Sequence, residues 1–305
     1  MSKKLVNILK WIWLIVVLAG AGWYFYSHFQ EISGYLATLS ISRILISAVF
    51  LLIGKALLSD ITRLSLKKVD WKIPYNEAFS ITSITQLGKY LPGGIWHFAG
   101  KFGIYKVKGI STRQTTQAMI YENIWLLSSA TVIGLLMLLG SSGGVMCGYF
   151  DLLCDPRVVT ALLIALPFAW LAALYFYERY FFKDKKADLS GFGLVLLEQM
   201  AIWALFGVSF WLVFPPHAGF LMPVIGAFSL SWVAGYVAFF APGGIGIREV
   251  LLTVILGGFF ASQEVAVYAT IHRVLWVLME IIVGTISAVF IGLPGSNDTP
   301  AENSH

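Results

Sequence analysis

Long apolar stretches, separated by short and mostly basic connections, run through almost the whole chain. A helix that spans a bilayer needs about 20 predominantly apolar residues. The pattern therefore predicts an all-α integral membrane protein with about six spanning helices. The predicted spans are Leu9–Tyr26, Ser42–Thr62, Thr116–Leu139, Val158–Phe176, Leu194–Phe214 and Val265–Leu293.

Two further apolar stretches, about 78–102 and 220–260, are each interrupted by the tetrapeptide Pro-Gly-Gly-Ile. Proline ends an incoming helix because it has no N–H to donate, and glycine tolerates the positive φ of a tight reversal. Lipid cannot satisfy an open backbone, so a broken helix at membrane depth requires surrounding protein or a wet cavity. Interrupted segments at matching positions of two halves are typical of transporter binding sites.

Basic residues indicate which loops face the cytoplasm. Most of the 21 Lys and Arg residues lie in the N-terminal tail and in three loops, near 63–72, 101–113 and 179–186, whereas Arg43 and Arg157 lie on the opposite side. Both connections that flank the first Pro-Gly-Gly are thus cytoplasmic. We therefore expect the first interrupted stretch to be a re-entrant hairpin and both termini to be cytoplasmic.

The second half repeats the order of helices and hairpin found in the first half. It starts on the outer side of the membrane, so its hairpin would enter from that side. Its first arm is long enough that it could instead cross the membrane fully. The sequence predicts an inverted repeat with halves 1–140 and 141–293, followed by a disordered polar tail, 294–305.

Composition supports lipid as the main solvent. Hydrophobic residues make up 58% of the chain and charged residues 12%, against roughly 25% charged residues in soluble domains. The chain has no basic run with interleaved aromatic residues, so nothing in it indicates nucleic-acid binding. Cys147 and Cys154 cannot form a zinc site alone. A disulfide between them is one outcome, and two reduced thiols are favoured. We expect no metal, no other cofactor and no catalytic residue.

The second elbow, 242–249, is the most specific motif. The positive end of the helix that leaves it suits an anion. Arg248 adds a guanidinium that binds phosphate bidentately, and Glu249 is expected to hold or gate it. The alternative is a kinked helix with an Arg–Glu pair at the interface. The site residues predicted here are Pro242, Gly243, Gly244, Gly246, Arg248 and Glu249.

The first elbow carries the same triplet between two lysines. Both lysines are expected to face a central cavity as point charges for phosphate, or else to reach the cytoplasmic headgroups. His97 would carry protons or pack as a hydrogen-bonded core histidine. The site residues predicted here are Lys89, Pro92, Gly93, Gly94 and Lys101.

Ionisable residues inside predicted spans cost roughly 2.5–3.5 kcal/mol each, so they should face protein and find partners. Arg273 and Glu280 share a helix face and would form a structural ion pair, or Arg273 would join Arg248 at an anionic headgroup. Lys55 is expected to reach the cytoplasmic interface. Glu122, Glu198, Arg273 and Glu280 are these intramembrane charges, and all except Glu198 are assigned to the site.

These motifs resemble the lysylphosphatidylglycerol synthase transmembrane, or flippase-like, family. It includes the membrane half of the bacterial multiple peptide resistance factor and stand-alone relatives. The resemblance rests on Pro-Gly-Gly-x-Gly-x-Arg-Glu at 242–249, on Leu-Pro-Gly at 91–93 and on the multi-span layout. Members often carry Gly-Arg after the first elbow and an aromatic–Arg pair in the last helix. The partial matches are Gly100-Lys101 and His272-Arg273.

The resemblance implies a multi-pass protein of the bacterial inner membrane that flips a lipid or a lipid-linked phosphate intermediate. The headgroup would bind between the elbows. We expect no aminoacyl-transferase domain, so lysyl transfer is not implied, and no ATP-binding motif is present. Two alternatives stand: an integral membrane transferase of cell-envelope synthesis, with Glu122 or Glu249 as acid or base, and a non-transporting scaffold. Expected partners are anionic membrane lipids, cell-envelope synthesis enzymes and further copies of the chain.

Overall fold

The computed structural model describes residues 23, 26–27, 29–90, 95–141, 146–148, 150–182, 189–215, 220–238 and 241–291, and this part of the chain contains no strand. The predicted all-α fold class is thus confirmed. The elements are α2 (Phe29–Ala37), α3 (Ile41–Lys68), α4 (Tyr75–Gln86), η1 (Leu87–Tyr90), α5 (Trp96–Val107), α6 (Thr112–Ser141), η2 (Met146–Gly148), η3 (Asp151–Cys154), α7 (Pro156–Phe181), α8 (Leu189–Trp211), α9 (Leu221–Val237), η4 (Pro242–Gly244), α10 (Ile247–Leu256), α11 (Ser262–Ile286) and η5 (Ser287–Ile291).

Five helices are long and apolar enough to cross a membrane, namely α3, α6, α7, α8 and α11. They coincide with five of the six predicted spans, which makes the chain a multi-pass membrane protein. The sixth prediction, Leu9–Tyr26, lies outside the described residues apart from residues 23 and 26. Local signals set some helix ends: the Asp155 side chain accepts a hydrogen bond from the Arg157 N–H, and Pro156 occupies the first helical position of α7.

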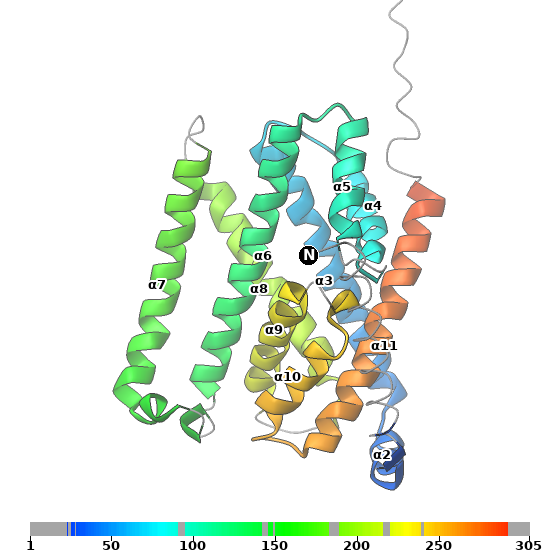
Figure 1. Ribbon diagram of the computed structural model, residues 1–305, viewed down its shortest axis with the longest axis vertical. Coiled ribbons are helices and arrows are strands. Elements are labelled where there is room, and N and C mark those ends of the chain that lie inside the picture. The colour runs from blue at the N-terminus through cyan, green and yellow to red at the C-terminus, as the bar shows by residue number, and fades with distance from the viewer. Residues whose placement is uncertain are drawn as a thin grey trace, which may run out of the picture.

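The two interrupted stretches form helical hairpins that enter the bundle from opposite ends (Figure 1). The first consists of α4, η1 and α5, and the second of α9, η4 and α10. In the second, the arms have 17 and 10 residues, which at 1.5 Å per residue is roughly 25 and 15 Å. Both arms are therefore shorter than a hydrocarbon core of about 30 Å. The first arm, which the sequence allowed to cross fully, is also shorter than the five helices of spanning length.

Each half of the bundle covers the hairpin of the other half. Helix α6 packs on α9, α11 packs on α4, α3 packs on α8, and the two elbows η1 and η4 meet. This arrangement matches the inverted order, whereas the halves 1–140 and 141–293 stay a prediction. Small residues permit the close approach of α6 and α9: a Cβ on Gly226 would lie 2.9 Å from the carbonyl oxygen of Gly134.

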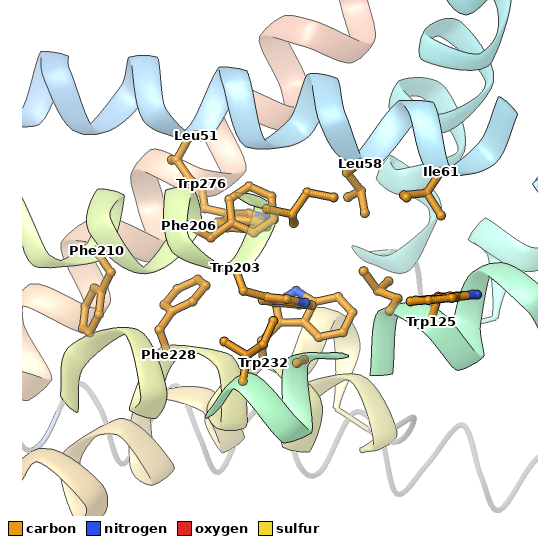
Figure 2. Packing of buried hydrophobic residues seen from close by; sticks show 14 of the residues in the cluster. Leu51, Leu58, Ile61, Trp125, Trp203, Phe206, Phe210, Phe228, Trp232 and Trp276 are labelled. Atoms are coloured by element: carbon orange, nitrogen blue, oxygen red, sulfur yellow. The ribbon is translucent and has the colours of Figure 1, made fainter. Parts of the chain in front are cut away.

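An aromatic layer fills the core beside the elbows (Figure 2). The ring centroids of Trp203 and Trp232 lie 5.0 Å apart, and those of Phe206 and Trp276 lie 4.7 Å apart. Their edge-to-face geometry is favoured by aromatic quadrupoles. This packing fixes the indole rings of Trp232 and Trp276, which form part of the site described below.

The C-terminal ends of α3 and α5 lie at the upper end of the bundle in Figure 1, and the start of α7 lies at the lower end. Lys67 and Lys106 belong to the last turns of α3 and α5, and Arg157 to the first turn of α7. Cys147 and Cys154 form a disulfide between α6 and α7, with Cα atoms 4.6 Å apart. The prediction of two reduced thiols was therefore wrong. The short turns η2 and η3 pack on each other and bring the sulfur atoms together.

Labelling with a membrane-impermeant maleimide tests this arrangement. Single cysteines at Lys67 and Lys106, both exposed, should react from the same side of the membrane, and one at Arg157 should react from the other. Reaction of positions 67 and 106 from different sides would show that the first interrupted stretch crosses the membrane. Permeabilised vesicles, in which all three react, are the control.

Candidate functional site

The two elbows touch at mid-height of the bundle. Three glycines of the second elbow have positive φ: 59° at Gly243, 76° at Gly244 and 86° at Gly246. A Cβ on Gly243 would lie 2.9 Å from the ring of Tyr90 in the first elbow. The positive φ expected of these glycines is confirmed, and Pro242 is buried beside them. Residues 91–94, which include the predicted Pro92, Gly93 and Gly94, lie outside the described part of the chain.

Glu280 on α11 links the first elbow to the bundle through hydrogen bonds. Its Oε1 accepts hydrogen bonds from Lys55 Nζ at 2.7 Å, Lys89 Nζ at 2.6 Å and Trp276 Nε1 at 2.8 Å. Its Oε2 accepts one from the Tyr90 hydroxyl at 2.6 Å. One buried carboxylate thus serves two lysines from different elements.

Two predictions about these charges were wrong. Lys55 does not reach the interface, because its side chain is buried against Glu280 and its ammonium lies 4.1 Å from the centroid of the Trp276 ring. Arg273 and Glu280 do not form the expected ion pair. They share a face of α11, but the lysines occupy Glu280 and Arg273 turns to the second elbow.

Arg273 on α11 contacts the second elbow at two points. Its guanidinium donates a hydrogen bond to the Gly243 carbonyl, and its Nε lies 3.9 Å from Glu249 Oε1. The other oxygen of Glu249 accepts the Gly246 N–H at 2.7 Å, at the start of α10. Glu249 therefore pairs with Arg273 and caps α10, so the prediction that it holds Arg248 was wrong.

Arg248 forms no ion pair within the part of the chain that the structure describes. The residue is 7% exposed, and its Nε is buried without a hydrogen-bond partner. The guanidinium carbon lies 5.4 Å from the centroid of the Trp232 ring, and a Cβ on Gly235 would lie 2.5 Å from the Arg248 Nε. The sequence places glycine where α9 must make room for this side chain.

A hollow lies against Arg248, with a volume of about 420 Å³ including its open mouth. Lys89 reaches it from the first hairpin and Arg248 from the second, and Gln86, His97 and Tyr236 also line it. The ring centroid of His97 lies 3.9 Å from that of Phe98 and 6.1 Å from that of Tyr236. These contacts support the packing interpretation of His97.

Lys101 and Glu122 form a separate pair above the elbows. Lys101 Nζ lies 2.6 and 2.8 Å from the two carboxylate oxygens of Glu122 and donates to Thr62 Oγ1 at 3.0 Å. Both charged residues are buried, so Lys101 does not reach the headgroup layer. They are not among the residues that line the hollow. We therefore treat this pair as structural rather than as part of the anion site.

Sequence reasoning missed several residues that shape the site. A lysine inside an uninterrupted apolar stretch, as at position 55, signals a buried partner more strongly than an interfacial one. The aromatic residues gave no comparable signal, because the chain is rich in them throughout. The missed residues are Lys55, Gln86, Tyr90, Trp232, Tyr236 and Trp276.

Among the described residues, no group of three or more His, Cys, Asp or Glu side chains lies close enough to hold a metal ion. Comparison of the chain with protein-family models and with curated proteins gives no match. The function is therefore inferred from the geometry of the elbows and from the motifs.

Proposed function

We propose that the protein moves a lipid, or a lipid-linked phosphate intermediate, between the leaflets of a bacterial inner membrane. The anionic headgroup would bind between the two elbows while its tail stays in the bilayer. The main support for this proposal is the environment of Arg248. A buried guanidinium without a carboxylate is costly at membrane depth, and this one lines a hollow where an anion would neutralise it.

The surroundings of the hollow favour a ligand with an apolar tail. Ile95, Trp96 and Val237, which neighbour the lining residues in sequence, are 59%, 51% and 59% exposed. Each of these exposed apolar residues is within two positions of His97, Tyr236 or Ala238, which line the hollow. A soluble anion would gain nothing from their apolar surface, whereas an acyl or prenyl chain can lie on it.

The family resemblance and the charge distribution support the same proposal. The upper end of the bundle, with Lys67 and Lys106, would face the cytoplasm by the positive-inside rule. The disulfide then lies on the outer side, which is oxidising in bacteria. Hairpins that enter from opposite sides suit alternating access to one central site.

Reconstitution tests the proposal. In liposomes that contain the purified protein and a fluorescent anionic lipid, Arg248→Ala should slow transbilayer movement roughly tenfold or more, because hydrogen bonds to charged groups contribute about 1.5–3 kcal/mol. Arg157→Ala, which removes an exposed arginine at the lower end, should leave the rate unchanged. Unchanged movement in a correctly folded Arg248→Ala protein would contradict the site.

A further inference from the structure

The elbow site holds more positive than negative charge. Within the described residues its cations are Lys55, Lys89, Arg248 and Arg273, and its carboxylates are Glu249 and Glu280. The elbow positions outside the described part are 91–94 and 239–240, and their sequences contain no ionisable residue. With histidine neutral, four cations against two carboxylates leave two positive charges unbalanced.

Both surplus charges face the same hollow. Lys55 and Lys89 share the single carboxylate of Glu280, so one of the two lysines is uncompensated, and Lys89 is the one beside the hollow. Arg248 lines the hollow from the other hairpin without a carboxylate of its own. Arg273 is balanced by Glu249 and does not add to the surplus.

Three other buried or half-buried lysines of the described chain have a carboxylate each. The pairs are Lys68–Glu178, Lys101–Glu122 and Lys108–Glu77. One carboxylate for each lysine is therefore the pattern in these three pairs, and the elbows depart from it. Because an unneutralised charge at membrane depth is expensive, a surplus of two suits a ligand that brings two negative charges.

We propose that the site selects a dianionic phosphate group, a phosphomonoester or a diphosphate, over a monoanionic phosphodiester. This inference rests on the proposed function and narrows its cargo. A dianion neutralises Lys89 and Arg248 together: the planar guanidinium takes two oxygens and the ammonium takes a further one. A phosphodiester leaves one of the two cations buried without a counter-charge.

Matched prenyl ligands test the inference on the purified full chain in detergent. Farnesyl phosphate and its methyl ester share the tail and differ by one methyl group and one negative charge. At pH 8 farnesyl phosphate should bind roughly tenfold tighter or more, by calorimetry. The preference should disappear towards pH 5, because the second ionisation of a phosphomonoester lies near pH 6. Farnesyl diphosphate should follow the monoester, and inorganic phosphate should bind far more weakly.

Substitutions test whether Lys89 and Arg248 cause the preference for farnesyl phosphate over its methyl ester. Lys89→Gln and Arg248→Gln each remove one surplus charge, and each should reduce the preference for the monoester to about twofold or less, since one cation then suffices for one charge. Arg157→Gln removes a cation outside the site and should keep the full preference. Thermal melting and gel filtration identify any variant that does not fold, and the comparison of ligands on the unmodified protein needs no variant.

The outcomes separate this inference from the proposed function. Equal affinities of the two farnesyl ligands for the unmodified protein, with binding lost in Arg248→Gln, would overturn dianion selection and leave the proposed function standing. Absence of binding by every farnesyl ligand would overturn both. Inorganic phosphate that binds as tightly as farnesyl phosphate would overturn a lipid-linked ligand in favour of free phosphate.

Discussion

Glu280→Gln is expected to lower the free energy of unfolding by about 3–5 kcal/mol, because removal of one partner from a buried ion pair leaves uncompensated charge behind. In this variant two lysines lose their carboxylate partner at once. Lys55 and Lys89 both donate to Glu280 Oε1, and a neutral amide cannot balance either ammonium. Chemical unfolding in detergent, followed by tryptophan fluorescence, measures the change.

The matched variant is Lys55→Met, which should cost far less, about 1 kcal/mol, the contribution of a typical hydrogen bond. Lys89 still neutralises Glu280 in that variant, and methionine fills much of the space of the lysine stem. Loss of the Glu280 carboxylate should thus destabilise the protein far more than loss of the Lys55 ammonium. Similar losses in the two variants would show that the lysines do not share Glu280 in the way the distances indicate.

Gly244→Ala is expected to destabilise the protein by at least about 2 kcal/mol, because an L-residue pays about 1–2 kcal/mol for a left-handed conformation even before any clash. Gly244 has φ of 76°. An added Cβ would lie 2.7 Å from the Gly235 Cα and 3.0 Å from the Arg248 Nε. Backbone atoms of α9 cannot yield as a flexible side chain can, so the elbow must open.

Gly103→Ala on α5 is the control for this change. No heavy atom lies within 4 Å of the Cβ that it would add, and alanine is favoured over glycine in a helix by roughly 1 kcal/mol. The control should melt at the same temperature as the parent protein or slightly higher. Gly244→Ala should melt lower and move the fluorescent lipid more slowly, since Arg248 is displaced. A parent-like melting temperature for Gly244→Ala would refute the tight elbow.

Local properties of the sequence were enough for five of the six predicted spans and for the two interrupted stretches. A spanning helix is defined by the thickness of the bilayer and by its own apolar residues, so α3 and α6 appear in the hydropathy pattern without knowledge of any neighbour. The positive φ of Gly243 and Gly244 follows in the same way from the triplet. The hairpin at the first elbow was predicted from the basic loops on both of its sides, because basic loops stay on one side of the membrane.

The partners of the buried charges were decided by tertiary structure. Lys55 and Glu280 are 225 positions apart, and they meet because the depth and rotation of α3 and α11 bring their side chains to one point. Those rotations depend on the packing of every helix, such as the close contact of α6 and α9 at Gly134. Hence Arg248 and Glu249, neighbours in the sequence, face different surroundings. The carboxylate caps its own helix beside Arg273, and the guanidinium lines the hollow.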